Sequence, residues 1–305
     1  SFEDVTLSRS SLGWWREIGV GQFASVYEAR TKEGERVALK LWHRPVSEKT
    51  YSGSPPSMDT LTFMTEVSLL LAIARESSML YQHKAHGLAD VDGGVQGLRG
   101  FIVTELLPGV NMQQRFHSDD PVTMPLVRKW AKQLAALLAE LHRIGVIHRD
   151  VKASNVMVLD ATNDLNLIDF GLSLRSSGGP LEGKLTTHQS SLGVGVLGYM
   201  APEVFRGDPY GTPVDVFAYG VLLSKMLRQA QPLDTRESLL RWLLCAPFEL
   251  LPCAQQWSYA VFCQQCSVVP RRSPAELSSL VRWCCEHDAA RRPRMADAVE
   301  HLKNV

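Results

Sequence analysis

The sequence predicts an α+β protein with two lobes, a small antiparallel β lobe with one helix and a larger, mainly helical lobe. Up to Thr104 the chain is rich in short strand candidates, and one clear helical pattern surrounds Glu66. Leu107-Pro108-Gly109 then breaks the pattern and is typical of a connector. We therefore expect one lobe at about 12–106 and the other at about 107–305.

The smaller lobe is predicted to contain two strands joined by a glycine-rich turn at 19–26. Glycines there let backbone amides approach an anion closely, although Ala24 stands where such a loop has its third glycine. A short apolar strand follows and ends at Lys40, and 47–60 is predicted to be a flexible surface loop. The helix around Glu66 has apolar residues at three-and-four spacing: Phe63, Val67, Leu70 and Leu71.

The larger lobe is predicted from a long amphipathic helix at 124–144, with further helices at 215–227 and within 273–305. His142 and His148 lie beside the core helix in sequence, and we expect both to be structural. The apolar side of the long helix consists of Val127, Trp130, Leu134, Leu137, Leu138 and Leu141.

The composition fits a chain with sizeable cores, because 45% of its 305 residues are hydrophobic. Basic and acidic residues balance at 32 each, so we expect neither nucleic acid nor an anionic membrane as the main partner. No apolar run approaches the roughly 20 residues that a membrane-spanning helix needs.

All six cysteines fall in the last quarter of the chain. In the cytosol they would be reduced thiols, whereas in a secretory compartment an even number would suit disulfides. Cys263-Gln264-Gln265-Cys266 has the spacing of half a zinc site, but no second suitable pair follows, so we expect no zinc. The compartment stays open, cytoplasmic by default with secretion as the alternative. The cysteines are Cys245, Cys253, Cys263, Cys266, Cys284 and Cys285.

The segment at 148–155, His-Arg-Asp-Val-Lys-Ala-Ser-Asn, is the most informative in the chain, together with Asp-Phe-Gly at 169–171. It places a carboxylate (Asp150), a lysine and an asparagine ahead of a second carboxylate, Asp169. Phosphoryl transfer from a nucleotide to a hydroxyl needs a carboxylate to orient that hydroxyl, and ligands that hold magnesium against the phosphates. This order and spacing therefore predict such a transfer.

Further motifs agree with this prediction. Val37-Ala38-Leu39-Lys40 and Glu66 precede the segment, and Ala201-Pro202-Glu203 follows Gly171 after a loop of about thirty residues, a length unusual unless functional. With these motifs the chain resembles the eukaryotic protein kinases of the serine/threonine type, from about Trp14 to the last helix. The resemblance implies ATP and magnesium as cofactors and proteins as substrates. A Pro-Pro-Ser element before the helix around Glu66 is also similar to the secreted rhoptry kinases of apicomplexan parasites.

The resemblance assigns a role to each matching residue. Asp150 would orient the substrate hydroxyl, Lys152 would offset charge near the γ-phosphate, and Asn155 and Asp169 would hold magnesium. Lys40 would contact the α- and β-phosphates, and Glu66 would be its ion-pair partner. The remaining ATP-site residues would be Gly19, Val20, Gly21 and Ala24 in the glycine-rich turn, Val26, Ala38 and Met157 around the adenine, Thr104 at the back of the pocket, and Glu105 and Leu107 at the adenine edge.

Two alternatives to an active serine/threonine kinase follow from the same residues. Serine/threonine kinases carry a threonine seven residues before the glutamate of Ala-Pro-Glu, and here that position is Val196. Val196 and Ala24 favour a pseudokinase that binds nucleotide or partners without catalysis, whereas the phosphate and magnesium ligands favour an active but slow enzyme. A small-molecule kinase is disfavoured by Ala-Pro-Glu, by Asp215, which is expected to anchor the backbone at 148–149, and by Arg292, which is expected to pair with Glu203.

The segment between Gly171 and Glu203 is the predicted activation loop. Arg149 precedes Asp150, and a buried guanidinium there would call for an anionic partner. The loop offers one carboxylate, Glu182, and a cluster of four hydroxyl residues at 186–191, so we expect phosphorylation of this cluster, by an upstream kinase or by the chain itself, to supply that anion. The hydroxyl residues are Thr186, Thr187, Ser190 and Ser191, with the two threonines favoured.

Overall fold

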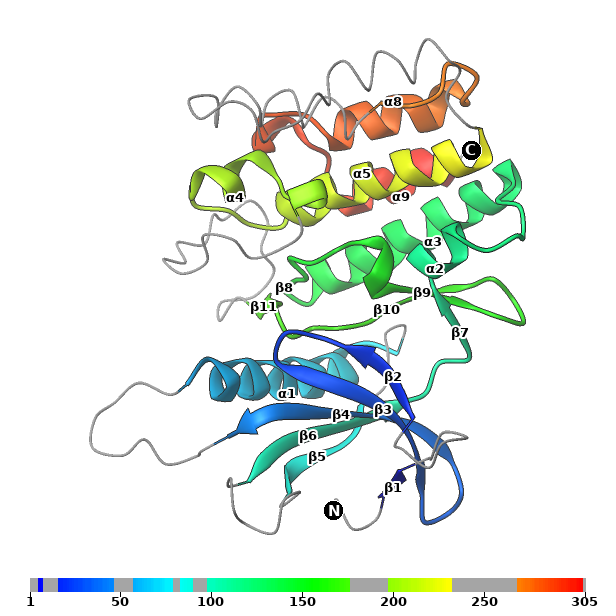
Figure 1. Cartoon of the computed structure of the whole chain (residues 1–305). Helices are drawn as coiled ribbons and strands as arrows, with labels where there is room; N and C mark the ends of the chain where they lie inside the picture. The colour runs from blue at the N-terminus through cyan, green and yellow to red at the C-terminus, as the bar shows by residue number, and fades with distance from the viewer. Residues whose placement is uncertain are drawn as a thin grey trace, which may run out of the picture. The chain divides into compact units, whose positions relative to one another are not determined.

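The computed structural model describes residues 5–7, 16–46, 57–78, 83–89, 98–175, 197–231 and 268–303. The chain divides into two compact units, 1–108 with 169–173, and 109–168 with 174–305. The first unit is an antiparallel sheet with one helix, and the second is mainly helical, as the labels and colours of Figure 1 show. The predicted fold class is therefore confirmed.

The sheet of the first unit is antiparallel throughout, in the order β1-β3-β4-β6-β5, and β2 also pairs with β3. The prediction that the apolar strand ends at Lys40 was wrong. β4 continues to Pro45 because Leu41 and Trp42, both buried, extend the alternation of side chains between the two faces. The strands are β1 (Val5–Leu7), β2 (Glu17–Val20), β3 (Ala24–Thr31), β4 (Arg36–Pro45), β5 (His83–Ala89) and β6 (Arg99–Glu105).

The strand register places four of the predicted site residues on one face of this sheet. Val26 lies opposite Lys40 on the neighbouring strand, and Ala38 lies opposite Thr104. Paired residues share a face, and so do residues two apart on one strand, which joins both pairs. The opposite face is occupied by an apolar cluster, so only this face is open to a ligand or helix; the cluster contains Ala29, Val37, Leu39, Leu41, Ala89, Phe101 and Val103.

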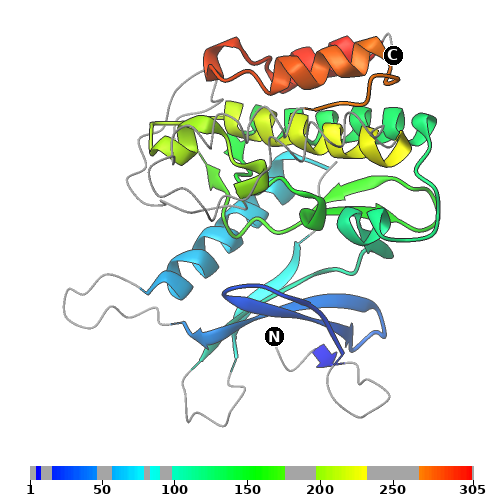
Figure 2. The ribbon, with the colours of Figure 1, turned by 45° about the horizontal axis from the view of Figure 1, so that its top comes forward.

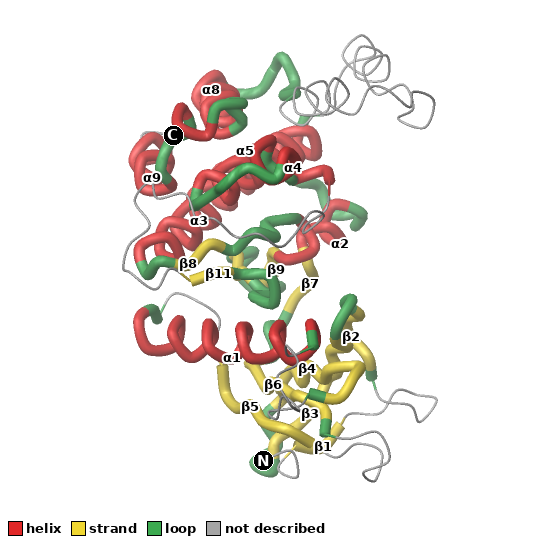
Figure 3. Tube along the Cα trace, turned by 90° about the vertical axis from the view of Figure 1, so that its left-hand side faces the viewer, coloured by secondary structure: helices red, strands yellow, loops and turns green. Residues whose placement is uncertain are grey.

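Helix α1 (Met58–Glu76) packs on the face that carries Lys40 and Trp42. The rings of Phe63 and Trp42 meet edge to face with centroids 5.1 Å apart, and Figure 3 shows the helix lying across the strands. Gly100 permits this contact, because a Cβ there would lie 2.7 Å from the Phe63 ring. The helix buries Phe63, Val67 and Leu70 as predicted, together with Glu66.

The C-terminal end of the loop predicted at 47–60 was wrong. Residues 58–60 belong to α1, because the Ser57 hydroxyl oxygen accepts the Thr60 amide at 3.2 Å and caps the helix there. Positions 47–56 lie outside the described residues.

The second unit is built around α3 (Met124–Arg143), which confirms the predicted long helix. Its predicted apolar side is buried, and α5 and α9 pack against it, with α8 against α5 (Figure 2). Gly220 allows α5 to approach α8 closely, because a Cβ there would lie 2.7 Å from the Cys285 sulfur. The other helices and 3-10 turns are α2 (Met112–Phe116), η3 (Ala153–Asn155), η4 (Leu197–Tyr199), α4 (Pro202–Arg206), α5 (Pro213–Ala230), α8 (Ala275–Cys284), η6 (Ala289–Arg291) and α9 (Met295–Lys303).

Short strands of the second unit frame its loops. β7 (Gly109–Asn111), β9 (Val156–Leu159) and β10 (Leu165–Leu167) form one sheet, and β8 (Val146–Ile147) pairs with β11 (Leu174–Arg175). Two of the six cysteines, Cys284 and Cys285, fall among the described residues, and both are free thiols. None of the helices in the described ranges combines the length and apolar character needed to cross a lipid bilayer.

Candidate active site

The first unit brings Lys40 together with two carboxylates. Its ammonium lies 2.9 and 2.8 Å from the two oxygens of Glu66, and 2.8 Å from Asp169 Oδ1. Glu66 is buried on α1, whereas the side chain of Asp169 is 46% exposed. The predicted ion pair of Lys40 and Glu66 is present, and Asp169 extends it to a cluster of three charged groups. The sheet contributes Lys40, helix α1 contributes Glu66, and the Asp-Phe-Gly segment contributes Asp169.

The charge of Lys40 is maintained by these neighbours. Burial by itself favours the neutral amine, but the carboxylates of Glu66 and Asp169 outweigh it and raise the pKa of Lys40 above its usual value. Lys40 is therefore a fixed cation, as a residue that binds phosphate oxygens must be.

The Asp-Phe-Gly segment is held in a specific backbone conformation. Asp169 has a φ of 66°, in the left-handed region, and the Phe170 side chain beside it is buried. A Cβ on Gly171 would lie 3.1 Å from Glu66 Oε2 and 3.4 Å from Asp169 Oδ1. A side chain at position 171 would therefore crowd both carboxylates that hold Lys40.

The glycine-rich turn joins β2 and β3 as predicted. The Gly21 amide donates to the Ala24 carbonyl oxygen at 2.9 Å and closes the turn, while Ala24 itself is buried. The Val20 side chain is 70% exposed, and Val26 is half-buried on the face that carries Lys40. Ala24 therefore fits the turn without a positive φ, so its methyl group does not distort the loop.

The second unit holds the other cluster, at 148–155. Asp150 is buried, and its Oδ2 accepts hydrogen bonds from Lys152 Nζ at 2.6 Å and from Asn155 Nδ2 at 2.8 Å. Both bonds fall on Oδ2, and no other described residue bonds to Oδ1. One carboxylate oxygen is thus fixed by its neighbours, and the other can accept a proton from a hydroxyl.

Asn155 has the chemistry of a magnesium ligand. Its amide nitrogen donates two hydrogen bonds, to the Asp150 carboxylate at 2.8 Å and to the Asp150 carbonyl oxygen at 2.9 Å. Because two oxygens accept from this nitrogen, the amide orientation is settled and the amide oxygen is left for a cation. Magnesium prefers oxygen ligands, so the Asn155 amide in the second unit and the Asp169 carboxylate in the first each have the donor chemistry that the kinase motif implies.

Asp215 anchors the backbone before Asp150, as predicted. Its Oδ2 accepts the His148 amide at 2.8 Å and His142 Nε2 at 2.9 Å, and its Oδ1 accepts the Arg149 amide at 2.8 Å. Burial by itself raises the pKa of Asp215, but the hydrogen bonds from His142 and the His148 amide outweigh it and hold that pKa below its usual range. Arg149 has a φ of 65°, and the bond to Asp215 stabilises this unusual conformation next to Asp150.

His148 is structural, as expected, and its tautomer follows from its partners. The Asp150 amide donates to Nδ1 at 3.3 Å, so Nδ1 is the acceptor and Nε2 carries the proton. Nε2 donates to the Ile168 carbonyl oxygen at 3.3 Å, and the ring is fully buried. The His148 ring therefore links the backbone at residues 150 and 168.

Arg149 differs from its prediction. Its guanidinium is half-buried, not buried, and one partner is the neutral hydroxyl of Tyr210 at 2.8 Å. No local pattern could have revealed a partner that lies 61 residues away. Val196, Glu182 and the four hydroxyl residues of the activation loop lie outside the described residues, so the expected phosphate partner stays a prediction.

Arg292 and Glu203 form the predicted ion pair inside the second unit. The two Nη atoms lie 2.6 and 2.9 Å from the Glu203 oxygens, in bidentate geometry. Nε donates to the Glu286 carbonyl oxygen, and the remaining donors reach the carbonyl oxygens of Pro213 and His287. All five donors are used, which ties Ala-Pro-Glu to the segment before α9.

The residues predicted to surround the adenine are divided between the units. Val26, Ala38 and Thr104 share the face of the first sheet that carries Lys40. Met157 is half-buried on β9 in the second unit. Glu105 ends β6, and Leu107 follows it as a buried residue before the boundary at 108.

One contact of the second cluster was not predicted. The Tyr199 hydroxyl accepts the Ala153 amide at 3.3 Å, and the ammonium of Lys225 lies 3.8 Å from the Tyr199 ring centroid. Tyr199 stands four residues before Glu203, and this fixed spacing from Ala-Pro-Glu is the only sequence signal that could have pointed to it.

Residues 14–302 match the family described as the protein kinase domain. The chain belongs to the protein kinase family. A dual specificity protein kinase, shkC, of Dictyostelium discoideum is 27% identical over 94% of this kinase chain and 50% of its own length. The hormonally up-regulated neu tumor-associated kinase homolog A of Xenopus laevis is 28% identical over 93% of this chain and 36% of its own.

A protein named as a probable serine/threonine-protein kinase, also of Dictyostelium discoideum, is 26% identical over 100% of this chain and 29% of its own length. The chain thus spans half or less of the curated kinases named here. The family is established, and the narrower resemblance to rhoptry kinases stays a prediction.

Proposed function

We propose that this kinase transfers the γ-phosphate of ATP, with magnesium, to serine and threonine hydroxyls of protein substrates. Asp150 orients the hydroxyl, and Lys152 offsets the charge that develops during transfer. Lys40 binds the α- and β-phosphates, and Asn155 and Asp169 hold magnesium, which neutralises the phosphates when bound. The compartment is proposed to be cytoplasmic, with secretion as the alternative.

The observation that carries the proposal is that Lys40 is charged and bonded to two carboxylates. Its ammonium is held at 2.8 to 2.9 Å by Glu66 and Asp169, and both carboxylates keep it charged. A chain that had lost catalysis would have no need for this ion pair together with Asp150, whose Oδ1 is left for a hydroxyl. The segment Gly198-Tyr199-Met200 before Ala201 also suits a pocket for small aliphatic hydroxyls.

Substrate type has further support from the comparisons and the loop sequence. Lys152, two residues after Asp150, is typical of serine/threonine kinases, and one relative bears that activity in its name. The dual specificity relative makes tyrosine the alternative acceptor.

The second candidate is a pseudokinase, and Val196 is the observation that favours it. The missing hydroxyl removes one positioning hydrogen bond, which contributes roughly 0.5–1.5 kcal/mol, or about tenfold in rate at most. Another residue shortly before Ala-Pro-Glu already holds the 148–155 loop, because the Ala153 amide donates to the Tyr199 hydroxyl. We therefore favour an enzyme that is slow over one that is inactive.

Incubation with labelled ATP, magnesium and a mixed peptide substrate separates the two candidates. We expect labelled peptide that contains phosphoserine and phosphothreonine, and none without magnesium. Label only on tyrosine would overturn the substrate assignment. Nucleotide binding without transfer, in wild type and in Asp150→Asn alike, would establish the pseudokinase.

A further inference from the structure

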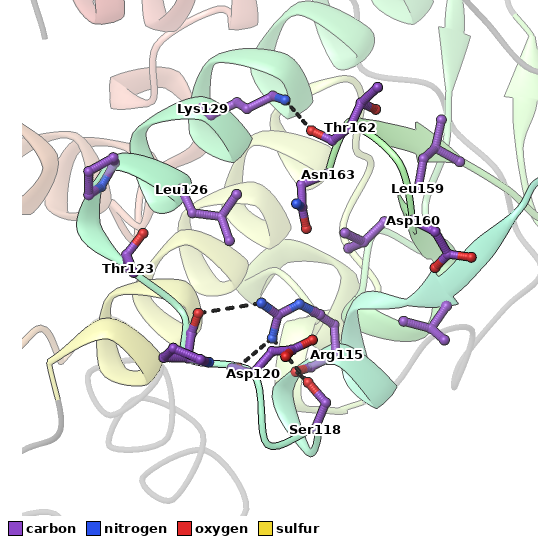
Figure 4. Close-up of a pocket in the computed structure, with 14 residues that line it drawn as sticks. Arg115, Ser118, Asp120, Thr123, Leu126, Lys129, Leu159, Asp160, Thr162 and Asn163 are labelled. Atoms are coloured by element: carbon purple, nitrogen blue, oxygen red, sulfur yellow. Dashed lines mark hydrogen bonds between the residues drawn. The ribbon is translucent and has the colours of Figure 1, made fainter.

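The basic side chains of the groove in Figure 4 are used to build the second unit. Lys129 donates to the Thr162 carbonyl oxygen, and Arg115 donates to the loop that leads into α3. Two histidines on β5 of the first unit are differently placed. Among the described residues, the side chains of His83 and His86 bond to each other and to the backbone of their own strand, and to no other element.

A β-bulge brings the two rings together. Thr104 and Val103 are neighbours on β6, but their partners on β5, at positions 83 and 85, are separated by one extra residue. Residues three apart on a regular strand point to opposite faces, whereas this bulge turns His83 and His86 to the same face. Ala85 points the other way and packs against the apolar cluster of the sheet.

The distance between the rings is close to that of two ligands on one metal ion. His86 Nδ1 lies 3.1 Å from His83 Nε2, and the ring centroids are 5.0 Å apart. Zinc binds imidazole nitrogens at about 2.0–2.1 Å, so tetrahedral geometry places two such nitrogens about 3.3 Å apart. The observed separation is slightly shorter. Because His86 is exposed, its ring can move by the difference.

The tautomer of His83 also suits a metal ligand. Burial and the charge of His86 lower the pKa of His83, whereas a hydrogen bond with the Ala85 backbone acts in the opposite direction. A bond that favours the protonated ring is donated by that ring, so the acceptor is the Ala85 carbonyl oxygen. Since Nε2 faces His86, Nδ1 carries the proton and Nε2 has the lone pair. Metal-bound histidines commonly donate their other ring nitrogen to a carbonyl oxygen in this way.

The surroundings of the pair admit a cation. Lys84, which lies between the two histidines in the sequence, pairs with Glu35. Among the described residues, His86 is the only group whose charge shifts the pKa of His83. β5 is an edge strand, and His83 is half-buried while His86 is exposed. Water can therefore reach the pair and complete the coordination of an ion.

We propose that His83 Nε2 and His86 Nδ1 bind a divalent transition metal ion such as zinc, with water in the remaining positions. Imidazole nitrogen suits zinc, copper and nickel, whereas magnesium prefers oxygen ligands. The ion replaces the proton between the two rings, and His86 then carries its proton on Nε2. No group of three or more metal-ligating side chains occurs within the described ranges, so the protein supplies two ligands. The site is separate from the magnesium that the proposed function assigns to Asn155 and Asp169.

Calorimetric titration with zinc chloride tests the site directly. The chain is freed of metal with EDTA, exchanged into fresh buffer and titrated in excess magnesium, which should not compete for nitrogen ligands. His86→Gln keeps a polar side chain at an exposed position. It should weaken one equivalent of bound zinc by at least the roughly 10- to 100-fold that loss of an outer-shell partner costs a metal site. His83→Gln should have the same effect.

Two comparisons separate this site from other zinc ligands. Zinc held by cysteines contributes equally to the wild type and to both histidine variants. His117→Gln removes an exposed histidine of the second unit, which bonds to the Gln113 carbonyl oxygen, and it should leave zinc binding at the wild-type value. Equal zinc binding by the wild type and His86→Gln would overturn the proposal.

Nitrogen NMR of the histidine rings tests the geometry. In a chain with isotopically labelled histidine, both rings of the pair should carry a proton on Nδ1 in the absence of zinc. Saturating zinc should shift His83 Nε2 and His86 Nδ1 and move the His86 proton to Nε2, while the His117 signals stay unchanged. A His86 ring that keeps its Nδ1 proton in saturating zinc would refute coordination by the pair. Neither measurement uses ATP or a substrate, so a failure here leaves the proposed function intact, and an inactive enzyme leaves the metal site intact.

Discussion

Replacing Asp215 by asparagine is the most informative single change, because one buried carboxylate holds the backbone beside Asp150. It accepts three hydrogen bonds, from the amides of His148 and Arg149 and from the His142 ring. Asparagine keeps one acceptor oxygen. If that oxygen takes the place of Oδ2, the amide nitrogen faces the Arg149 amide, donor against donor.

The cost can be worked out from these bonds. An unsatisfied buried amide costs about 1–3 kcal/mol, and each remaining bond drops from roughly 1.5–3 to roughly 0.5–1.5 kcal/mol when its acceptor loses charge. The sum is about 3–6 kcal/mol of a domain stability that is typically about 5–15 kcal/mol. We expect Asp215→Asn to lower Tm by on the order of 10 °C. Phosphate transfer should also fall, because Arg149 loses the bond that stabilises its φ of 65°.

Thermal unfolding with Asp208→Asn as the control measures this effect. Asp208 is 47% exposed and pairs with Arg206 at the surface, so its loss should cost at most about 1 kcal/mol. The folded-state pKa of Asp215 is depressed, so its stabilisation is complete above the unfolded pKa of about 3.9 and is lost as pH falls through the folded value. The Tm difference between the wild type and Asp215→Asn should therefore shrink only below a pH of about 3.9. A Tm loss no larger than that of the control would refute the reasoning.

Three further predictions follow from the site and the connector. Asp169→Asn should abolish magnesium-dependent transfer of labelled phosphate at nearly unchanged Tm. Lys40→Met should abolish it too but with a lower Tm, because the buried Glu66 carboxylate loses its ion-pair partner. Near-normal turnover of either variant would contradict the assigned role. Gly109→Ala should lower Tm, because its φ is +150° and a Cβ would lie 2.1 Å from the Val158 carbonyl oxygen. Gly198→Ala, with open space around it, is the matched control. Alanine at all four hydroxyl residues of the 186–191 cluster should slow transfer to a peptide. Unchanged activity, with no loop phosphate by mass spectrometry, would exclude the switch.

The sequence by itself indicated the kinase family and most of the helices. Asp150, Lys152 and Asn155 lie within six residues of one another, and their order alone pointed to phosphoryl transfer. The 124–144 helix was predicted for the same reason, since helical periodicity is visible over a few turns. Residue type and short-range spacing are local properties, and a single sequence displays them directly.

Only the tertiary structure decided which distant residues meet. Lys40 contacts a carboxylate 129 positions away, and Arg149 meets Tyr210 through the packing of a loop that has no periodicity. The histidine pair was likewise invisible, because only the bulge in β5 turns His83 and His86 to the same face. Strand register and the packing of helices depend on steric fit across the whole chain, and no short stretch of sequence contains that information.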